Sequence, residues 1–158
     1  FFSNRTLDFK FKCSVGKKGV CNKKVEGDLT TPKGIFNLGN IYYRSDRVQK
    51  PFSKLKSISI KKNMGWCDDP NSKFYNKLIK IKKNLKISHE KLYRKDHKYD
   101  FFILIKYNYK NPIKLKGSAI FLHITKNYLP TKGCVALCEK DFLILAKLIN
   151  KKTKIKIN

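Results

Sequence analysis

The sequence lacks several features that would each indicate a particular class of protein. No apolar run approaches the ~20 residues of a membrane-spanning helix, so we expect no membrane span. There is no Cys-x-x-Cys pair and no Cys/His set with zinc-finger spacing, so we predict no metal site. The GKKG stretch at residues 16–19 lacks the spacing of a phosphate-binding loop and predicts a simple turn. Repeats and interdomain linkers are also absent, so residues 1–158 predict a single domain with its own core.

Acidic residues are scarce. Asp and Glu number 11 against 37 Lys and Arg, which gives a formal net charge of +26. One explanation is an anionic partner, such as nucleic acid or an acidic surface. The other is coding bias, since Lys far exceeds Arg, and Ile, Asn, Phe and Tyr are also abundant. The lysines form no stripe and no nucleic-acid-binding motif occurs, so we favour coding bias and predict no nucleic-acid partner. The charge still predicts electrostatic association with anionic polymers or membrane surfaces at low salt.

The cysteine count is odd, so at least one of the five thiols stays unpaired if the others form disulfides. One or two disulfides in an oxidising compartment, or unpaired buried thiols, are open alternatives for Cys13, Cys21, Cys67 and Cys138. The chain begins with Phe1 and not with methionine, so we expect that an N-terminal piece, such as a signal peptide, has been removed. We expect a monomer.

Hydrophobic periodicity predicts mostly strands. Alternating or apolar stretches predict strands over residues 6–15, 35–43, 55–60, 101–107, 118–125 and 153–157. An amphipathic helix is predicted over residues 139–149, and a short helix over residues 88–93. Polar, Gly- and Pro-containing stretches predict a loop over residues 22–34 and a turn with a helix start over residues 65–76. The pattern is typical of an α+β domain that is mainly β.

Residues 117–137, GSAIFLHITKNYLPTKGCVAL, carry the strongest chemical signal. Alternation places His123 on the same face of a strand as Phe121, near the strand's end. A short polar loop follows, and Gly133 permits a tight turn directly before Cys134. A cysteine attacks as the thiolate, and a nearby histidine can take its proton. The segment therefore predicts nucleophilic catalysis by a cysteine–histidine pair.

The residues GSAIFLH, TKGC and VAL, together with GDLTTPKGIF at residues 27–36, resemble the L,D-transpeptidase catalytic domain, the YkuD-like family of peptidoglycan enzymes. The resemblance runs over residues 13–137. It is closest to a compact subgroup with WCDDP, here residues 66–70, and a Tyr-Asn pair, here residues 75–76. It implies a YkuD-like β-sandwich or mixed sheet with one clear C-terminal helix. Three positions depart from the family pattern: Ile124 replaces a glycine, Lys132 a second histidine and Ala136 an arginine.

The resemblance also implies roles for the residues around the cysteine. Cys134 is the expected nucleophile and His123 its base, with the backbone of Gly133 and Cys134 around the oxyanion. Thr131 orients His123 or lines the site, or it is a plain loop threonine. His97 is the rival base and an alternative substrate contact. No metal and no cofactor are implied.

Further residues are candidates for substrate binding. The planar guanidinium groups of Arg44 and Arg47 suit the carboxylates of peptidoglycan stem peptides, although a salt bridge to Asp46 is the alternative. Asp69 lies in an acidic turn that is either a wall of the substrate groove or a capped turn. Tyr75 and Asn76 join this set through the resemblance.

The resemblance implies an L,D-transpeptidase, a cysteine acyltransferase that crosslinks or remodels the cell wall and influences cell shape. The expected partners are peptidoglycan stem peptides, and the expected location is the periplasm or cell envelope. One alternative is an L,D-carboxypeptidase or endopeptidase that uses the same cysteine–histidine pair with water. The alternative from another class is a non-catalytic cationic binder of cell wall or nucleic acid.

Overall fold

A mixed sheet forms the centre of the computed structural model, which describes residues 9–22 and 25–158. Its strands run in the order β1–β11–β10–β9–β4–β12, and β5 pairs with the far end of β4. The strands are β1 (Cys13–Ser14), β4 (Gly34–Tyr43), β5 (Ser57–Ser59), β9 (Phe101–Ile105), β10 (Phe121–Ile124), β11 (Val135–Leu137) and β12 (Lys154–Ile157). The pairs β10–β11 and β4–β5 are parallel, and the other pairs of this sheet are antiparallel.

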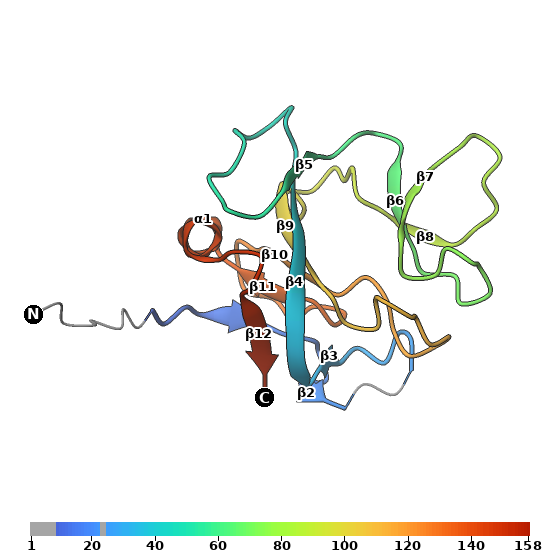
Figure 1. The fold of residues 1–158 in the computed structure, drawn as a ribbon, viewed down its shortest axis with the longest axis horizontal. Helices are drawn as coiled ribbons and strands as arrows, with labels where there is room; N and C mark the ends of the chain where they lie inside the picture. The colour runs from blue at the N-terminus through green and yellow to red at the C-terminus, as the bar shows by residue number, and fades with distance from the viewer. Residues whose placement is uncertain (1–8, 23–24) are drawn as a thin grey trace, which may run out of the picture.

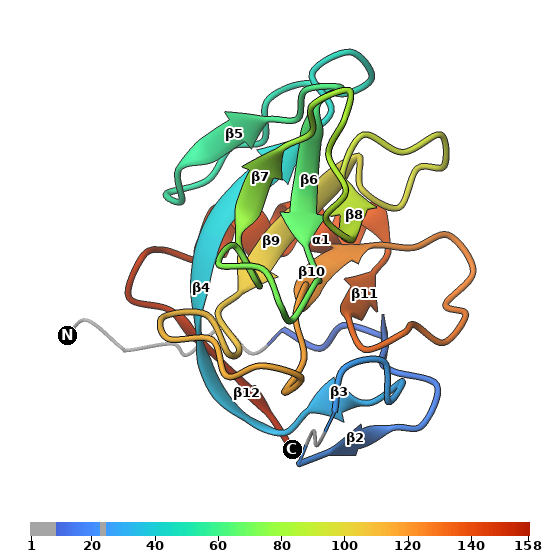
Figure 2. The same ribbon diagram turned by 90° about the vertical axis from the view of Figure 1, so that its right-hand side faces the viewer.

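Opposite faces of the central sheet carry different elements. Helix α1 (Glu139–Leu148) covers one face, and a small antiparallel sheet covers the other (Figure 1). In the small sheet, β6 (Met64–Cys67) lies between β7 (Leu78–Lys80) and β8 (His89–Lys91). Figure 2 shows this sheet in front of β9 and β10. A short parallel pair, β2 (Val20–Cys21) and β3 (Thr31–Pro32), lies near the start of β4.

Each face of the central sheet has its own apolar core, because side chains alternate along the strands. Leu122 of β10 packs in the core on the helix side, which includes the fully buried Phe142 of α1. Phe121 belongs to the opposite core with Trp66 and Phe102, under the small sheet. The alternation predicted for residues 118–125 is thereby confirmed, and His123 shares a face with Phe121.

The predicted fold class is confirmed, since the structure is mainly β with one helix, α1, in its described residues. That helix carries Glu139 and Asp141 in its first turn and Lys147 in its last turn. Negative charge near the N-terminus and positive charge near the C-terminus both interact favourably with the helix dipole. The predicted strands over residues 35–43, 55–60, 101–107, 118–125 and 153–157 each contain a strand of the central sheet.

Four local predictions differ from the structure. The predicted loop over residues 22–34 contains strand β3 (Thr31–Pro32), which pairs with β2. The short helix over residues 88–93 is wrong, because His89–Lys91 pairs with β6 as strand β8 and the amide of Leu92 donates to the Met64 carbonyl. The predicted turn with a helix start over residues 65–76 is wrong in part, because its first residues belong to strand β6 and the turns that follow start no helix. Of the predicted strand over residues 6–15, residues 6–8 lie outside the described part, and the rest contributes only Cys13–Ser14. Tertiary strand pairing outweighs local propensity in these segments.

Cys13, Cys21, Cys67 and Cys138 are free thiols, so the alternative with disulfides among them is not realised in this structure. No helix in the described residues is long and apolar enough to cross a membrane.

Candidate active site

Cys134 and His123 lie on one face of two adjacent parallel strands. His123 of β10 is opposite Ala136 of β11 in the register of the pair. Continuing this register by two residues places Cys134, which directly precedes β11, opposite Phe121. The Phe121 amide donates to Cys134 Sγ at 3.4 Å, in agreement with that placement. The thiol and the imidazole are thus diagonal neighbours on the face that the small sheet covers.

Two backbone groups hold the sulfur of Cys134. Its thiol donates to the Ala119 carbonyl at 3.3 Å, and Sγ accepts from the Phe121 amide at 3.4 Å. The segment that leads into β10 therefore provides both a hydrogen-bond acceptor for the thiol and a donor that stabilises a thiolate.

His123 is buried, with 6% of its surface exposed. Its Nδ1 lies 2.9 Å from the Ile124 carbonyl oxygen. A carbonyl oxygen only accepts, so Nδ1 carries the proton and Nε2 of the neutral ring has the free lone pair. Burial lowers the pKa of His123 to about 4, and the charges of Lys98 and Arg94 act in the same direction. The imidazole is therefore neutral near pH ~7 and able to accept a proton.

Tyr99 supports the imidazole. Its ring lies edge-on to the His123 ring, with a centroid distance of 5.5 Å and an interplanar angle of 65°. Its hydroxyl donates to Glu90 Oε1 at 2.6 Å. Burial, and next the negative charge that Cys134 carries when ionised, raise the pKa of Tyr99 well above its usual value, so the phenol stays neutral. Neither Tyr99 nor Glu90 was identified from the sequence, where KDHKYD gives only the pattern of a charged loop.

Thr131 shapes the turn that presents the cysteine. Its hydroxyl donates to the Cys134 carbonyl at 2.6 Å and accepts from the Gly133 amide at 3.0 Å. Gly133 has φ +141°, and a Cβ at this position would lie 2.9 Å from the Thr30 carbonyl oxygen. Glycine is required here by both the backbone conformation and the close approach. The Gly133 amide points at Thr131 in this structure.

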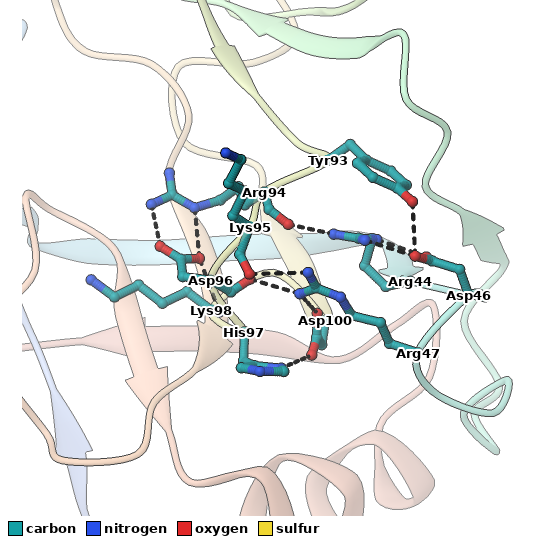
Figure 3. A network of polar contacts seen from close by, with 10 residues as sticks. All are labelled: Arg44, Asp46, Arg47, Tyr93, Arg94, Lys95, Asp96, His97, Lys98 and Asp100. Carbon is teal, nitrogen blue, oxygen red and sulfur yellow. Dashed lines mark hydrogen bonds and ion pairs between the residues drawn. The ribbon is translucent and has the colours of Figure 1, made fainter.

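Arg44 is engaged within the protein. It is 2% exposed, and its Nε and Nη2 each donate to an Asp46 carboxylate oxygen at 2.8 Å (Figure 3). Nη1 donates to the Arg94 carbonyl at 2.6 Å, and the guanidinium lies 3.5 Å from the ring centre of Tyr93. The guanidinium, through its hydrogen bonds, holds the pKa of Asp46 well below its usual value. These contacts favour the salt-bridge alternative over a grip on substrate.

Arg47 holds the neighbouring loop. Its Nη1 donates to Asp100 Oδ1 and to the Asp96 carbonyl, and its Nη2 to the Lys95 carbonyl, each at 3.0 Å (Figure 3). His97 is 57% exposed, and its Nδ1 lies 2.6 Å from the other oxygen of the Asp100 carboxylate. The imidazole of His97 thus points at Asp100, whereas His123 shares a face with Cys134.

The other three candidates lie in and beside the turn after β6. Asp69 Oδ1 accepts from the Asn71 amide at 2.9 Å, which is the capped-turn alternative. Tyr75 is 4% exposed, donates to Glu26 Oε2 at 2.6 Å and accepts from the Gly117 amide at 3.1 Å. Asn76 is 1% exposed and directs its amide group into the protein. In the described part of the chain, no group of three or more His, Cys, Asp or Glu side chains is arranged to hold a metal ion.

A comparison with protein-family models finds a match to the L,D-transpeptidase catalytic domain, YkuD, over residues 1–157. Searches of curated proteins and of solved structures find no match. The family match spans the sheet, the thiol and the imidazole described above. The chain therefore belongs to the L,D-transpeptidase catalytic domain (YkuD) family, whose enzymes act on the peptidoglycan of the cell wall.

Proposed function

We propose that this protein is an L,D-transpeptidase that transfers acyl groups between peptidoglycan stem peptides through a thioester on Cys134. The observation that carries the proposal is the state of His123. Its buried ring is neutral, its Nδ1 proton is engaged by the Ile124 carbonyl, and it lies beside the strand that presents Cys134. Such a ring has one free lone pair, at Nε2, with which to accept the proton of a nucleophile.

In the first half-reaction, Cys134 Sγ attacks a carbonyl carbon of the donor stem, and the thiol proton passes to Nε2 of His123. The imidazolium that forms keeps its Nδ1 proton on the Ile124 carbonyl, which stabilises the positive charge. The C–N bond then breaks, the departing amine takes the proton from Nε2, and the acyl group stays on sulfur as a thioester. In the second half-reaction, an acceptor amine of another stem attacks the thioester and the thiol is restored.

Backbone N–H groups around Cys134 stabilise the oxyanion in this proposal. The Gly133 amide donates to Thr131 in the resting structure, so we assign Thr131 and Gly133 chiefly to fixing the turn. Tyr99 keeps the plane of the His123 ring in place. The proposed chemistry needs no metal and no cofactor.

The proposed substrate contacts divide by burial. Asp69 and the exposed His97 are accessible to a stem peptide and stay proposed contacts. Arg44, Tyr75 and Asn76 are buried, so we propose that they shape the wall of the groove. Arg47 anchors the loop that carries His97. We further propose that residues 1–158 act as one catalytic domain and that the protein works as a monomer in the periplasm or cell envelope.

The test is incubation of the protein with purified muropeptides, followed by mass measurement of the products. We expect new crosslinked dimers with the parent and none with Cys134→Ala, because alanine cannot form the thioester. Cys138→Ala is the matched control and should keep most of the activity, since that thiol lies at the start of α1. Trimmed stems without dimers would instead identify a hydrolase. Full activity of Cys134→Ala would refute the cysteine mechanism.

A further inference from the structure

Asn76 forms hydrogen bonds with every part of its side-chain amide. Its Oδ1 accepts from Trp66 Nε1 at 2.9 Å and from the Ala119 amide at 3.1 Å. Its Nδ2 donates to the Tyr107 carbonyl at 3.0 Å and to the Asn108 carbonyl at 2.6 Å. Two acceptor sites and two donors exhaust the capacity of a primary amide. A buried side chain with this pattern ties together three segments that are distant in the sequence.

One of these segments has an unfavourable backbone conformation. Ala119 has φ +52°, in the left-handed region that a residue with a Cβ seldom occupies. Asn76 accepts from its amide, and the hydroxyl of the preceding residue, Tyr75, accepts from the amide of Gly117 at 3.1 Å. The adjacent side chains of Tyr75 and Asn76 therefore hold two amides of the chain just before β10.

The backbone conformation of Ala119 determines whether its carbonyl faces the thiol of Cys134. The Ala119 carbonyl accepts from the Cys134 thiol at 3.3 Å. With the Ala119 amide held by Asn76, rotation about the Ala119 N–Cα bond to a negative φ would carry the Ala119 carbonyl away from Sγ. A hydrogen bond from the thiol to a carbonyl favours the protonated form, so losing this bond eases ionisation.

We propose that Asn76 is a positioning residue for the nucleophile: through Ala119 it aims a carbonyl at the Cys134 thiol and holds the thiol protonated beside His123. The inference rests on the proposed function only in taking Cys134 as the reacting group. It also explains the choice of asparagine. The position itself has φ +56°, which asparagine tolerates, and it needs two donors and two acceptors on one short side chain.

The test measures the pH dependence of iodoacetamide alkylation at Cys134, followed by peptide mass in the intact protein. Asn76→Gly removes the amide and tolerates the positive φ. We expect its pH midpoint to fall by about half a unit, the size of one lost hydrogen bond. The matched control is Asn108→Gly. Asn108 also has a positive φ, +46°, and an amide with bonds to Ile113 and Gly117, but none to Ala119.

Both glycine variants should lower the melting temperature, but only Asn76→Gly should move the alkylation midpoint. If Asn76→Gly does not fold, Ala119→Val decides, because valine opposes the positive φ while Asn76 stays in place. We expect a lower midpoint for Ala119→Val, and a midpoint closer to that of the parent for Ala119→Gly. An unchanged or higher midpoint in the folded variant, or an equal shift in Asn108→Gly, would overturn the inference.

Alkylation reports on the thiol whether or not stem peptides are substrates. Absence of products with muropeptides would refute the proposed function and leave these pH profiles interpretable. With active protein, Asn76→Gly should lower kcat more than it raises KM, since Asn76 acts on the nucleophile through Ala119.

Discussion

Acidification should destabilise the protein through His123. In an unfolded chain its pKa is near 6.5, and in the folded protein burial lowers it to about 4. Between these values the unfolded chain binds a proton that the folded protein excludes. The contribution to stability is therefore intact above pH ~6.5 and declines as the pH falls toward ~4. The full difference corresponds to about 3 kcal/mol, of which about 2 kcal/mol is lost by pH ~5.

The measurement is the free energy of unfolding in urea at pH ~7 and at pH ~5, for the parent and for His123→Gln. Glutamine takes up no proton, so the parent should lose about 2 kcal/mol more than the variant over this range. Carboxylates that titrate in both proteins cancel in the comparison. Equal pH dependence in the parent and in His123→Gln would show that the imidazole is not kept neutral by burial.

Three other predictions concern the turn, the arginines and the net charge. Gly133→Ala should lower the free energy of unfolding in urea by about 1–3 kcal/mol and abolish most of the muropeptide turnover. The reasons are the φ of +141° at this position and the Thr30 carbonyl oxygen, which lies 2.9 Å from the added Cβ. Stability and turnover equal to those of the parent would refute a steric need for glycine. Replacing both Arg44 and Arg47 by Lys should lower melting temperature and turnover together, since lysine cannot reproduce their forked contacts; lost turnover at an unchanged melting temperature would favour a grip on stem carboxylates instead. Turnover of small muropeptides should hardly change up to ~0.15 M salt, while binding to intact wall falls; salt-sensitive turnover would count against coding bias as the origin of the charge.

The sequence was informative where structure is local. The alternation of apolar residues around His123 and the periodicity of residues 139–149 predicted a strand and a helix that the structure contains. The salt bridge between Arg44 and Asp46, two residues apart, was also visible as an alternative. Cys134 and His123 could be predicted as a catalytic pair because they lie in one segment, and the resemblance to the L,D-transpeptidase catalytic domain implied the role of each.

The parts that could not be predicted depend on contacts between distant residues. Strand β8 pairs with β6, more than twenty residues earlier, and only that partner makes residues 89–91 a strand. Tyr99, which lies just before β9, packs against His123 of β10. Asn76 accepts a hydrogen bond from Ala119, which is 43 positions later in the sequence. Periodicity and propensity describe neighbours along the chain, so they carry no information on such pairs.

The parallel pairing of β10 and β11 limits where the chain can change length. The connection between these strands, residues 125–134, is fixed near its end, where the Thr131 amide donates to the Val15 carbonyl and the Lys17 amide donates to the Thr131 carbonyl. A residue inserted before Thr131, beside the 63% exposed Leu129, can bulge into solvent without moving β11. A residue inserted between Thr131 and Cys134 would instead shift the register of β11 by one position, which would turn the Cys134 side chain to the face that α1 covers. A peptide tag in this connection should therefore be tolerated only on the N-terminal side of Thr131.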